Sequence, residues 1–304
     1  MKKTIAAVLL VLYVSPVFAA FTGGGAAPFL RAGSGARAMA MGSAFSAFYG
    51  DASLAYWNPA GITGIENAGI SSMYSWLTDD RTLNFLNFIY SSPAGHIGIN
   101  ILNFSIGGID IRESDTEIPD AVLTSNENAY YFTYAKELFE GISAGMNVKA
   151  VHIVFGEFNA FGLSFDAGVH LRLFDEVWFA VALQDVFGSI KWSTGTVEEL
   201  PFVFRIGSLA RLYGGQLNLA IEAEQDEVEG IYIKMGAEGR FFDIIFLRAG
   251  VVYGIRNYLF TPSAGAGIRY DFGGITGQLD YALAKDEYFS VVELKHRISM
   301  NIYF

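Results

Sequence analysis

FGLSFDAGVHLRL, residues 161–173, is the stretch that decides the fold of this chain. Every odd-numbered position in it carries an apolar side chain. The even-numbered positions carry Gly162, Ser164, Asp166, Gly168, His170 and Arg172. Because successive side chains of a β-strand point to opposite faces, this period of two predicts a strand with one apolar and one polar face. The strands of a soluble β-sandwich alternate in the same way, so this segment alone does not distinguish a soluble protein from a membrane protein.

The same alternation recurs from residue 66 to the end of the chain and yields about fourteen segments. We place them at 66–76, 81–91, 94–105, 128–137, 141–154, 160–173, 176–186, 202–212, 215–224, 230–240, 244–254, 259–271, 274–285 and 289–304. The chain is 52% apolar, yet after residue 20 it has no run near the roughly 20 apolar residues that a transmembrane helix needs. The sequence therefore predicts an all-β fold, an antiparallel transmembrane β-barrel of about 14 strands.

The connections between these segments alternate in length. One set is tight, as at Ser91–Pro93 and Phe174–Asp175, and the other set contains the longer loops 106–127 and 187–201. Short turns on one side and long loops on the other are typical of outer-membrane barrels, whose tight side faces the periplasm. We therefore expect both ends of the barrel chain on the periplasmic side.

The second and fourth segments alternate poorly. Both faces look apolar or aromatic around Leu86 and Phe88, and again from Tyr130 to Tyr134. An aromatic girdle or a bulge would explain this, and it is the simpler interpretation. The other interpretation is an apolar patch that faces the lumen.

The first 19 residues, MKKTIAAVLLVLYVSPVFA, have the pattern of a secretory signal peptide, with two lysines, a short apolar core and small residues before the expected cut after Ala19. An uncleaved membrane anchor is the alternative, but the apolar core is short for a span. Removal of Lys2 and Lys3 takes the formal charge from −11 to −13, which argues against nucleic acid as a partner.

The chain ends in Phe304, with Ile302, Met300 and Ile298 on the same predicted face. This ending resembles the C-terminal strand of outer-membrane barrels, which the barrel-assembly machinery reads. Phe304 is therefore our candidate for the barrel assembly signal. The signal peptide and this strand both predict localisation in the outer membrane of a Gram-negative-type bacterium.

Residues 20–65 interrupt the alternation and are rich in small residues. The pattern predicts a helix from Ala36 to Phe48 and a short one from Asp51, a plausible N-cap, that ends near Asn58 because Pro59 follows. The stretch is too short to form a core of its own, so we expect it to pack against or inside the barrel. The predicted organisation is a signal peptide (1–19), an N-terminal hatch or plug (20–65) and the barrel (66–304).

The run GSGARAMAMGSAFSAFYGDASLAYWNPAGI, Gly33 to Ile62, resembles the N-terminal signature of the PorV/PorQ family and, more distantly, the FadL-type outer-membrane transporters of hydrophobic compounds. The matching features are Gly35–Ala38, Met41–Gly42, Asp51–Ala52 and Tyr56–Gly61. The resemblance implies a fourteen-stranded barrel closed by a hatch. In FadL-type members a hydrophobic molecule enters from outside and leaves sideways through a gap beside a kinked strand, whereas PorV-like members receive exported proteins.

Our candidate hatch and gating residues are Trp57, Asn58, Pro59, Ala60 and Gly61. Pro59 would end the helix, and Gly61 would let the chain turn into the first strand.

No catalytic residues, cofactor or metal are predicted. The four histidines, His96, His152, His170 and His296, lack the close spacing of a metal site, and His296 falls on the lipid-facing side. Ser164, Asp166 and His170 share one face of one strand, but neighbours two apart lie about 7 Å from each other, too far for a catalytic triad. Gly33–Ala38 fits a loose dinucleotide pattern without the strand that should precede it.

The predicted lumen side carries many charges of both signs, which are Lys149, Asp166, Arg172, Arg205, Glu222, Lys234, Glu238, Arg240, Arg269, Asp280, Glu293, Lys295 and Arg297. They could line an ion-selective pore, or they could pair to fill the lumen and hold the hatch. The mixture of signs favours pairing, because unpaired buried charge is costly.

The sequence thus predicts a FadL-like barrel for passage of small hydrophobic compounds across the outer membrane. Its expected partners are membrane lipid, hydrophobic small molecules and the assembly machinery. Because the lumen is polar, an apolar route must be local, beside Trp57 or the second and fourth strands. The alternative is a PorV-like component of protein secretion or surface attachment, which would bind exported proteins.

Overall fold

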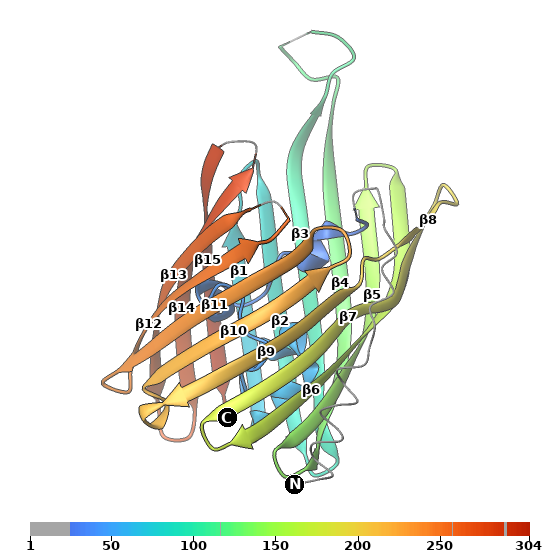
Figure 1. The fold of residues 1–304 in the computed structure, drawn as a ribbon. Helices are drawn as coiled ribbons and strands as arrows, with labels where there is room; N and C mark the ends of the chain where they lie inside the picture. Colours follow the sequence, from blue (N-terminus) through green and yellow to red (C-terminus); the bar gives the residue numbers. More distant parts are fainter. Residues whose placement is uncertain (1–24, 116, 257, 289–290) are drawn as a thin grey trace.

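The computed structural model describes residues 25–304 apart from 116, 257 and 289–290, and these residues form an antiparallel β-barrel (Figure 1). Pairing of β1 with β15 closes the ring, which has fourteen strands. The strands of the ring are β1 (Ala68–Trp76), β2 (Arg81–Ser92), β3 (Gly95–Ile111), β4 (Ala121–Phe139), β5 (Ile142–Phe155), β6 (Phe158–Phe174), β7 (Val177–Trp192), β9 (Val203–Leu212), β10 (Leu217–Asp226), β11 (Gly230–Phe241), β12 (Ile245–Gly254), β13 (Phe260–Asp271), β14 (Thr276–Tyr288) and β15 (Val291–Tyr303). A short strand, β8 (Val197–Glu199), pairs with the end of β7. The predicted fold class is confirmed.

The two faces of the strands differ as the sequence predicts. In β6, Phe161 is 57% exposed on the outside of the barrel, whereas Ser164 and Asp166 are buried on the inside. His296 of β15 is exposed on the outer face, as expected. Lipid can cover such an apolar exterior, and the hydrogen bonds of a closed ring leave no free strand edge in the membrane.

The strand bounds agree with the predicted segments to within two or three residues around most of the ring. Two predicted loops are wrong. Residues 106–127 extend β3 and β4 into a hairpin that projects beyond the other connections, and 187–201 contain the end of β7 and β8 (Figure 1). A hairpin in water needs no apolar face, so its strands lack the pattern used to find the others. We call the end of the barrel with this hairpin the outer end.

β2 and β4 carry apolar side chains on both faces, which supports the second interpretation, an apolar patch that faces the lumen. Leu86 and Phe88 of β2 are exposed on the outside, while Leu83 and Phe85 are buried on the inside. In β4, Tyr131 is likewise buried among inward-facing residues. The lumen therefore has an apolar patch along these strands.

The hatch lies inside the barrel (blue in Figure 1). Its elements are η1 (Pro28–Arg31), α2 (Ala36–Ala40), α3 (Leu54–Trp57) and η2 (Pro59–Gly64). The helix predicted from Ala36 to Phe48 is too long, since α2 ends at Ala40 and Gly42 has a φ of 63°. Here the hatch backbone presses on the wall, because a Cβ on Gly236 of β11 would lie 2.3 Å from Met41 O. Contact with the wall therefore decides where α2 ends.

The second hatch helix also begins later than predicted. α3 starts at Leu54 after Ser53, whose side chain makes no capping hydrogen bond. The Asp51 carboxylate accepts from Ser53 N (3.0 Å) and Ser53 Oγ (2.6 Å), and Asp51 O accepts from Leu54 N (3.1 Å), so Asp51 caps the turn that leads into α3, as predicted. The helix ends at Trp57, in front of Pro59, as predicted.

Export and assembly signals are predicted at the two ends of the chain. The predicted signal peptide, 1–19, lies outside the described residues. Phe304 is 45% exposed at the end opposite the outer hairpin, and its N–H donates to Ala68 O at 3.0 Å beside the closing pair of strands. Among the described residues, the helices are all too short or too polar to span a bilayer.

Candidate functional site

The predicted hatch residues occupy the centre of the contact between the hatch and the barrel wall. Trp57, Asn58, Pro59, Ala60 and Gly61 are all buried. Asn58 caps η2, because its Oδ1 accepts from Ala60 N (3.1 Å), and its Nδ2 donates to the carbonyl oxygens of hatch and wall residues. This single side chain ties the hatch to itself and to the barrel.

Glycines allow this close approach. A Cβ on Gly168 of β6 would lie 2.0 Å from Asn58 Oδ1, and a Cβ on Gly145 of β5 would lie 2.5 Å from Ala60 N. Within the hatch, Gly61 is needed for space rather than for a left-handed turn, since a Cβ there would meet Phe48 O at 2.9 Å. Gly61 is therefore needed for packing within the hatch, and the expected turn into the first strand lies after it, because η2 continues to Gly64 and β1 begins at Ala68.

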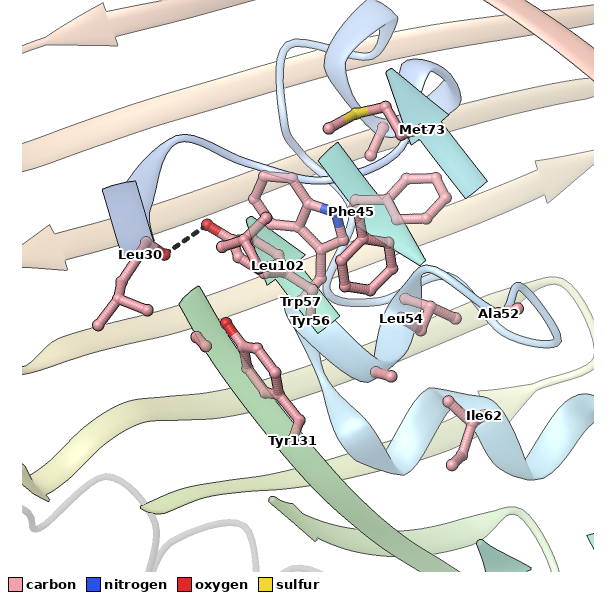
Figure 2. Packing of buried hydrophobic residues seen from close by; sticks show 14 of the residues in the cluster. Leu30, Phe45, Ala52, Leu54, Tyr56, Trp57, Ile62, Met73, Leu102 and Tyr131 are labelled. Atoms are coloured by element: carbon pink, nitrogen blue, oxygen red, sulfur yellow. Dashed lines mark hydrogen bonds between the residues drawn. The ribbon is translucent and has the colours of Figure 1, made fainter. Parts of the chain in front are cut away.

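An apolar wall, which we define as the buried apolar residues on the inward faces of β2–β5, covers part of the lumen and lies beside buried polar residues of the same strands, among them Asn87, Asn100 and Asn147. Its buried members are Leu83, Phe85, Ile89, Leu102, Ala129, Tyr131, Val151 and Ile153. The hatch packs Leu30, Leu54, Tyr56 and Trp57 into the same cluster (Figure 2). The apolar side chains of the hatch thus cover the apolar wall.

The polar atoms of the two hatch aromatics are satisfied within the hatch. Tyr56 donates its hydroxyl to Leu30 O (2.8 Å; Figure 2) and accepts from Gly33 N (3.0 Å). Trp57 Nε1 donates to Ser34 O at 2.8 Å. Burial raises the pKa of Tyr56, which keeps the phenol protonated and able to donate. These bonds fold the N-terminal part of the hatch over the aromatic pair.

On the opposite side, Arg37 of α2 fastens the hatch to the wall. Its Nε and Nη2 donate to the two carboxylate oxygens of Glu238 at 2.8 and 2.6 Å, and its Nη1 donates to Asp51 at 3.0 Å. The guanidinium also lies 4.9 Å from the centre of the Phe48 ring. Burial alone would lower the pKa of Arg37, but the two carboxylates raise it above its usual value, so the residue stays charged.

Many of the other buried lumen charges are paired as well, which supports the packing interpretation over an ion-selective pore. Ion pairs join Arg248 to Glu238 and Asp280, Lys149 to Asp166 and Asp185, Arg205 to Glu224, and Lys234 to Glu224. Sequence reasoning missed Arg248, Glu224 and Asp185. The alternation of β12 and β10 could have placed Arg248 and Glu224 inside. Asp185 faces inward only because of a local irregularity in β7.

That irregularity is a kink in β7. The register between β6 and β7 shifts twice between Leu163 and Ala167, and Asp185 and Phe187 have φ of 58° and 54°. The β7–β9 ladder ends at the pair of Gln184 and Val203, and the β7–β8 ladder begins further on. The kinked stretch therefore lies between two ladders.

A small chamber lies between the hatch and the outer halves of β9–β11. It holds about 70 Å³ of room for water-sized groups and is largely enclosed. It is lined by Arg31, Ala32, Gly33, Met39, Ser43, Trp57, Val203, Arg205, Glu224, Asp226, Glu229 and Lys234. Trp57 is thus part of both the apolar cluster and this chamber.

The residues considered for catalysis or metal binding are placed apart by the structure. Ser164 donates to Asp185 at 2.7 Å, whereas His170 bonds to Ala47 O at 2.9 Å and stacks on Tyr49. Within the described part of the chain, no three His, Cys, Asp or Glu side chains are grouped to hold a metal ion.

No protein-family model matches this chain, and no curated protein matches its sequence. Solved structures do resemble it. A structure described as the CymD monoaromatic hydrocarbon channel has a TM-score of 0.63 at 13% identity, covering 89% of this chain and 96% of that one. The toluene transporter TodX of Pseudomonas putida has a TM-score of 0.63 at 15% identity, covering 89% and 97%. A FadL homologue of Pseudomonas aeruginosa has a TM-score of 0.55 at 12% identity, covering 88% and 96%. The chain therefore shares the fold of FadL-type outer-membrane channels, a fourteen-stranded barrel with short helices near its N-terminus.

Proposed function

We propose that this protein lies in the outer membrane of a Gram-negative-type bacterium and lets small hydrophobic compounds pass across it, with the hatch as the gate. The observation that carries the proposal is the division of the lumen. The apolar wall lies on β2–β5, whereas most of the paired charges lie on β9–β14, and the pairs of Lys149 with Asp166 and Asp185 lie between them. We expect a hydrophobic compound to follow the apolar wall, where the buried lysine, Lys149, is neutralised by Asp166 and Asp185.

The hatch is built to open and close this path. Its apolar side chains cover the wall, while its ionic contact through Arg37 lies on the far side of the lumen. Displacement of Tyr56 and Trp57 would expose the apolar wall residues that they cover, and a hydrophobic ligand bound there would keep these residues out of water.

The kink in β7 offers a way out of the barrel. After Gln184, β7 leaves its ladder with β9, and from Ser189 onward it pairs with β8 instead. An opening here would release a compound into the membrane. A lateral exit suits an apolar cargo, because the cargo avoids water on leaving the lumen.

The neighbouring structures agree with this function. Two of them are described as a monoaromatic hydrocarbon channel and a toluene transporter. Both share the fold over nearly their whole length.

The test is uptake through an outer membrane whose lipopolysaccharide excludes hydrophobic molecules, since a simple phospholipid bilayer already admits them. The protein is expressed in cells that lack their own FadL-type channel, and N-phenyl-1-naphthylamine is added as a probe that fluoresces on reaching phospholipid. We expect faster uptake than in cells without the protein, and a further increase for Trp57→Ala. Trp76→Ala on the exposed outer surface of β1 is the matched control. Uptake equal to that of empty cells, with the barrel folded and inserted, contradicts the proposal.

The second candidate is a PorV-like role in secretion or surface attachment, which the projecting β3–β4 hairpin favours. The outer part of this hairpin pairs only within itself beyond Ile106 and Ser125, which leaves strand edges open to a protein partner. Under this role, deletion of 109–123 would abolish capture of an exported protein. Under the first role, the deletion would leave probe uptake intact.

A further inference from the structure

A groove runs across the outer surface of the barrel wall, over β7 and β9–β12. It is open to the surroundings and holds about 620 Å³. Leu219, Ile221 and Met235 are exposed along it, and the other outward-facing side chains are small, among them Ser208, Ala210, Ala237 and Ala249. The alternation of β10 and β11 turns these side chains away from the lumen, since Glu222 and Glu238 of the same strands are buried inside. The groove therefore lies on the opposite side of the wall from the hatch.

The groove is elongated, because a row of residues that pair from strand to strand follows it. The members of this row are Val177, Ala210, Leu219, Ala237 and Ala249. Neighbouring strands lie about 4.8 Å apart, so the four steps of the row give a length of about 19 Å. Val177 is the first residue of β7, whereas Ala249 lies four residues after the start of β12. The groove thus begins at the end of the barrel opposite the outer hairpin and continues into the lipid-facing wall.

The floor of the groove is backbone at Gly236 and Gly250, which pair with each other. The hatch accounts for these two glycines. A Cβ on Gly236 would lie 2.3 Å from Met41 O, and a Cβ on Gly250 would lie 2.0 Å from Gly42 N. The hatch does not account for the alanines of the row, whose side chains point away from the lumen and could be larger without meeting it. The hollow is therefore not a by-product of hatch docking.

The lining of the groove indicates what it holds. Among the described residues, none of the side chains that line it is charged, and Ser208 supplies the only hydroxyl. An occupant is therefore held by apolar contact along its length. Lipid covers this side of the wall, and the long, uncharged part of a lipid is its acyl chain.

The polar head of the same lipid must lie beyond the groove, because nothing in the lining can bind it. The groove reaches the end of the sheet at Val177, where β7 begins. At this end of the barrel the turn between β9 and β10 carries Tyr213, which is 76% exposed. Tyrosine is enriched where a membrane meets water, so this end suits a lipid head group.

A second copy of the chain fits the groove less well than an acyl chain. A two-fold axis brings the same surface of both copies together, so the groove of one copy would face the groove of the other. A void would remain between them, and atoms at a void lose their dispersion contacts. A flexible chain can follow the groove and fill it.

We infer that the groove binds one acyl chain of a phospholipid from the membrane leaflet at the end opposite the outer hairpin. The chain would lie along the row from Val177 to Ala249, with its head group near Tyr213. The inference rests on the outer-membrane location in the proposed function and does not depend on transport.

The test is native mass spectrometry of the folded protein in detergent, with added dipalmitoyl- or dihexanoyl-phosphatidylglycerol. The two lipids share a head group and differ in chain length. We expect one dipalmitoyl lipid to stay bound to each barrel. The dihexanoyl lipid should bind at least about tenfold more weakly, because its shorter chains bury fewer methylene groups in the groove. The detergent competes equally in every sample, so the samples can be compared.

Two variants test the location. Ala237→Phe and Ala210→Phe each place a ring in the groove and leave every charge and every hatch contact in place. Ala266→Phe, on the exposed outward face of β13 and outside the groove, is the matched control. Folding is followed by the change in gel migration on heating. We expect both groove variants to weaken binding of the dipalmitoyl lipid at least about tenfold and the control to leave it unchanged.

Four results overturn the inference. They are no bound lipid, equal binding of the two lipids, equal binding by the groove variants and the control, and a dimer that the groove variants dissociate, which would assign the groove to a second copy. Each can occur while uptake of N-phenyl-1-naphthylamine stays intact, and then only the lipid site fails. Absence of probe uptake by the unmodified protein would instead remove the transport function and leave the lipid site in place.

Discussion

Arg37→Met is the change that most directly tests whether the hatch is a gate. Methionine keeps an unbranched side chain against Phe45 and Phe48 but removes the two bonds to Glu238 and the bond to Asp51. The barrel wall itself stays paired, because Glu238 keeps its 2.6 Å bond from Arg248. The loss therefore falls on docking of the hatch rather than on the barrel.

The expected magnitude follows from these partners. Breaking a buried ion pair costs about 3–5 kcal/mol when one partner is left alone. Glu238 and Asp51 both keep other donors here, so the lower end, about 3 kcal/mol, applies. At about 1.4 kcal/mol for each tenfold change, the undocked fraction of the hatch should rise about 140-fold.

The absence of cysteine from the chain makes this fraction measurable. A cysteine introduced at Ala44 of the hatch, 2% exposed, reacts with a maleimide only when the hatch leaves the wall. Its labelling rate should rise in Arg37→Met by roughly the factor above. A cysteine at Ser114, in the exposed outer hairpin, corrects for reagent reactivity. An unchanged rate at Ala44 in a folded barrel would refute the assignment of Arg37 as the fastening of the gate.

Four further changes test other contacts of the site. Gly168→Val should displace the hatch and speed uptake of N-phenyl-1-naphthylamine, because the added Cβ would meet Asn58 Oδ1 at 2.0 Å, whereas Ala167→Val on the lipid face should leave uptake unchanged. Asn58→Ala should lower the free energy of unfolding by about 1–2 kcal/mol through loss of the η2 cap, seen as a lower midpoint in thermal unfolding. Lys149→Met should cost about 3–5 kcal/mol in urea titrations, since it leaves two buried carboxylates without their shared cation. Phe304→Ala should reduce the amount of heat-modifiable barrel in outer-membrane fractions without lowering total expression, and an unchanged amount would remove its role as an assembly signal.

Much of the barrel could be predicted because its signal is local. The alternation in 161–173 depends only on which face of a strand each side chain occupies, and the structure keeps that assignment from Phe161 to His170. The same is true of the strand count and of the end of α3 before Pro59, which follows from the covalent geometry of proline.

The contents of the lumen could be predicted only in part. The pairing of charges followed from their mixed signs, but the partners did not, because Arg37 and Glu238 are 201 residues apart. Asp185 was missed since the kink in β7 changes which face it occupies.

The sequence by itself thus determined the barrel, its strand faces and the presence of a separate N-terminal segment, because each depends on residues close together in the chain. The tertiary structure decided that β2–β5 present an apolar wall to the hatch, that α2 ends at Ala40, and that Trp57 borders a chamber with Arg205. These features arise where the hatch meets strands far away in sequence, and no local pattern records which distant surfaces will be brought into contact.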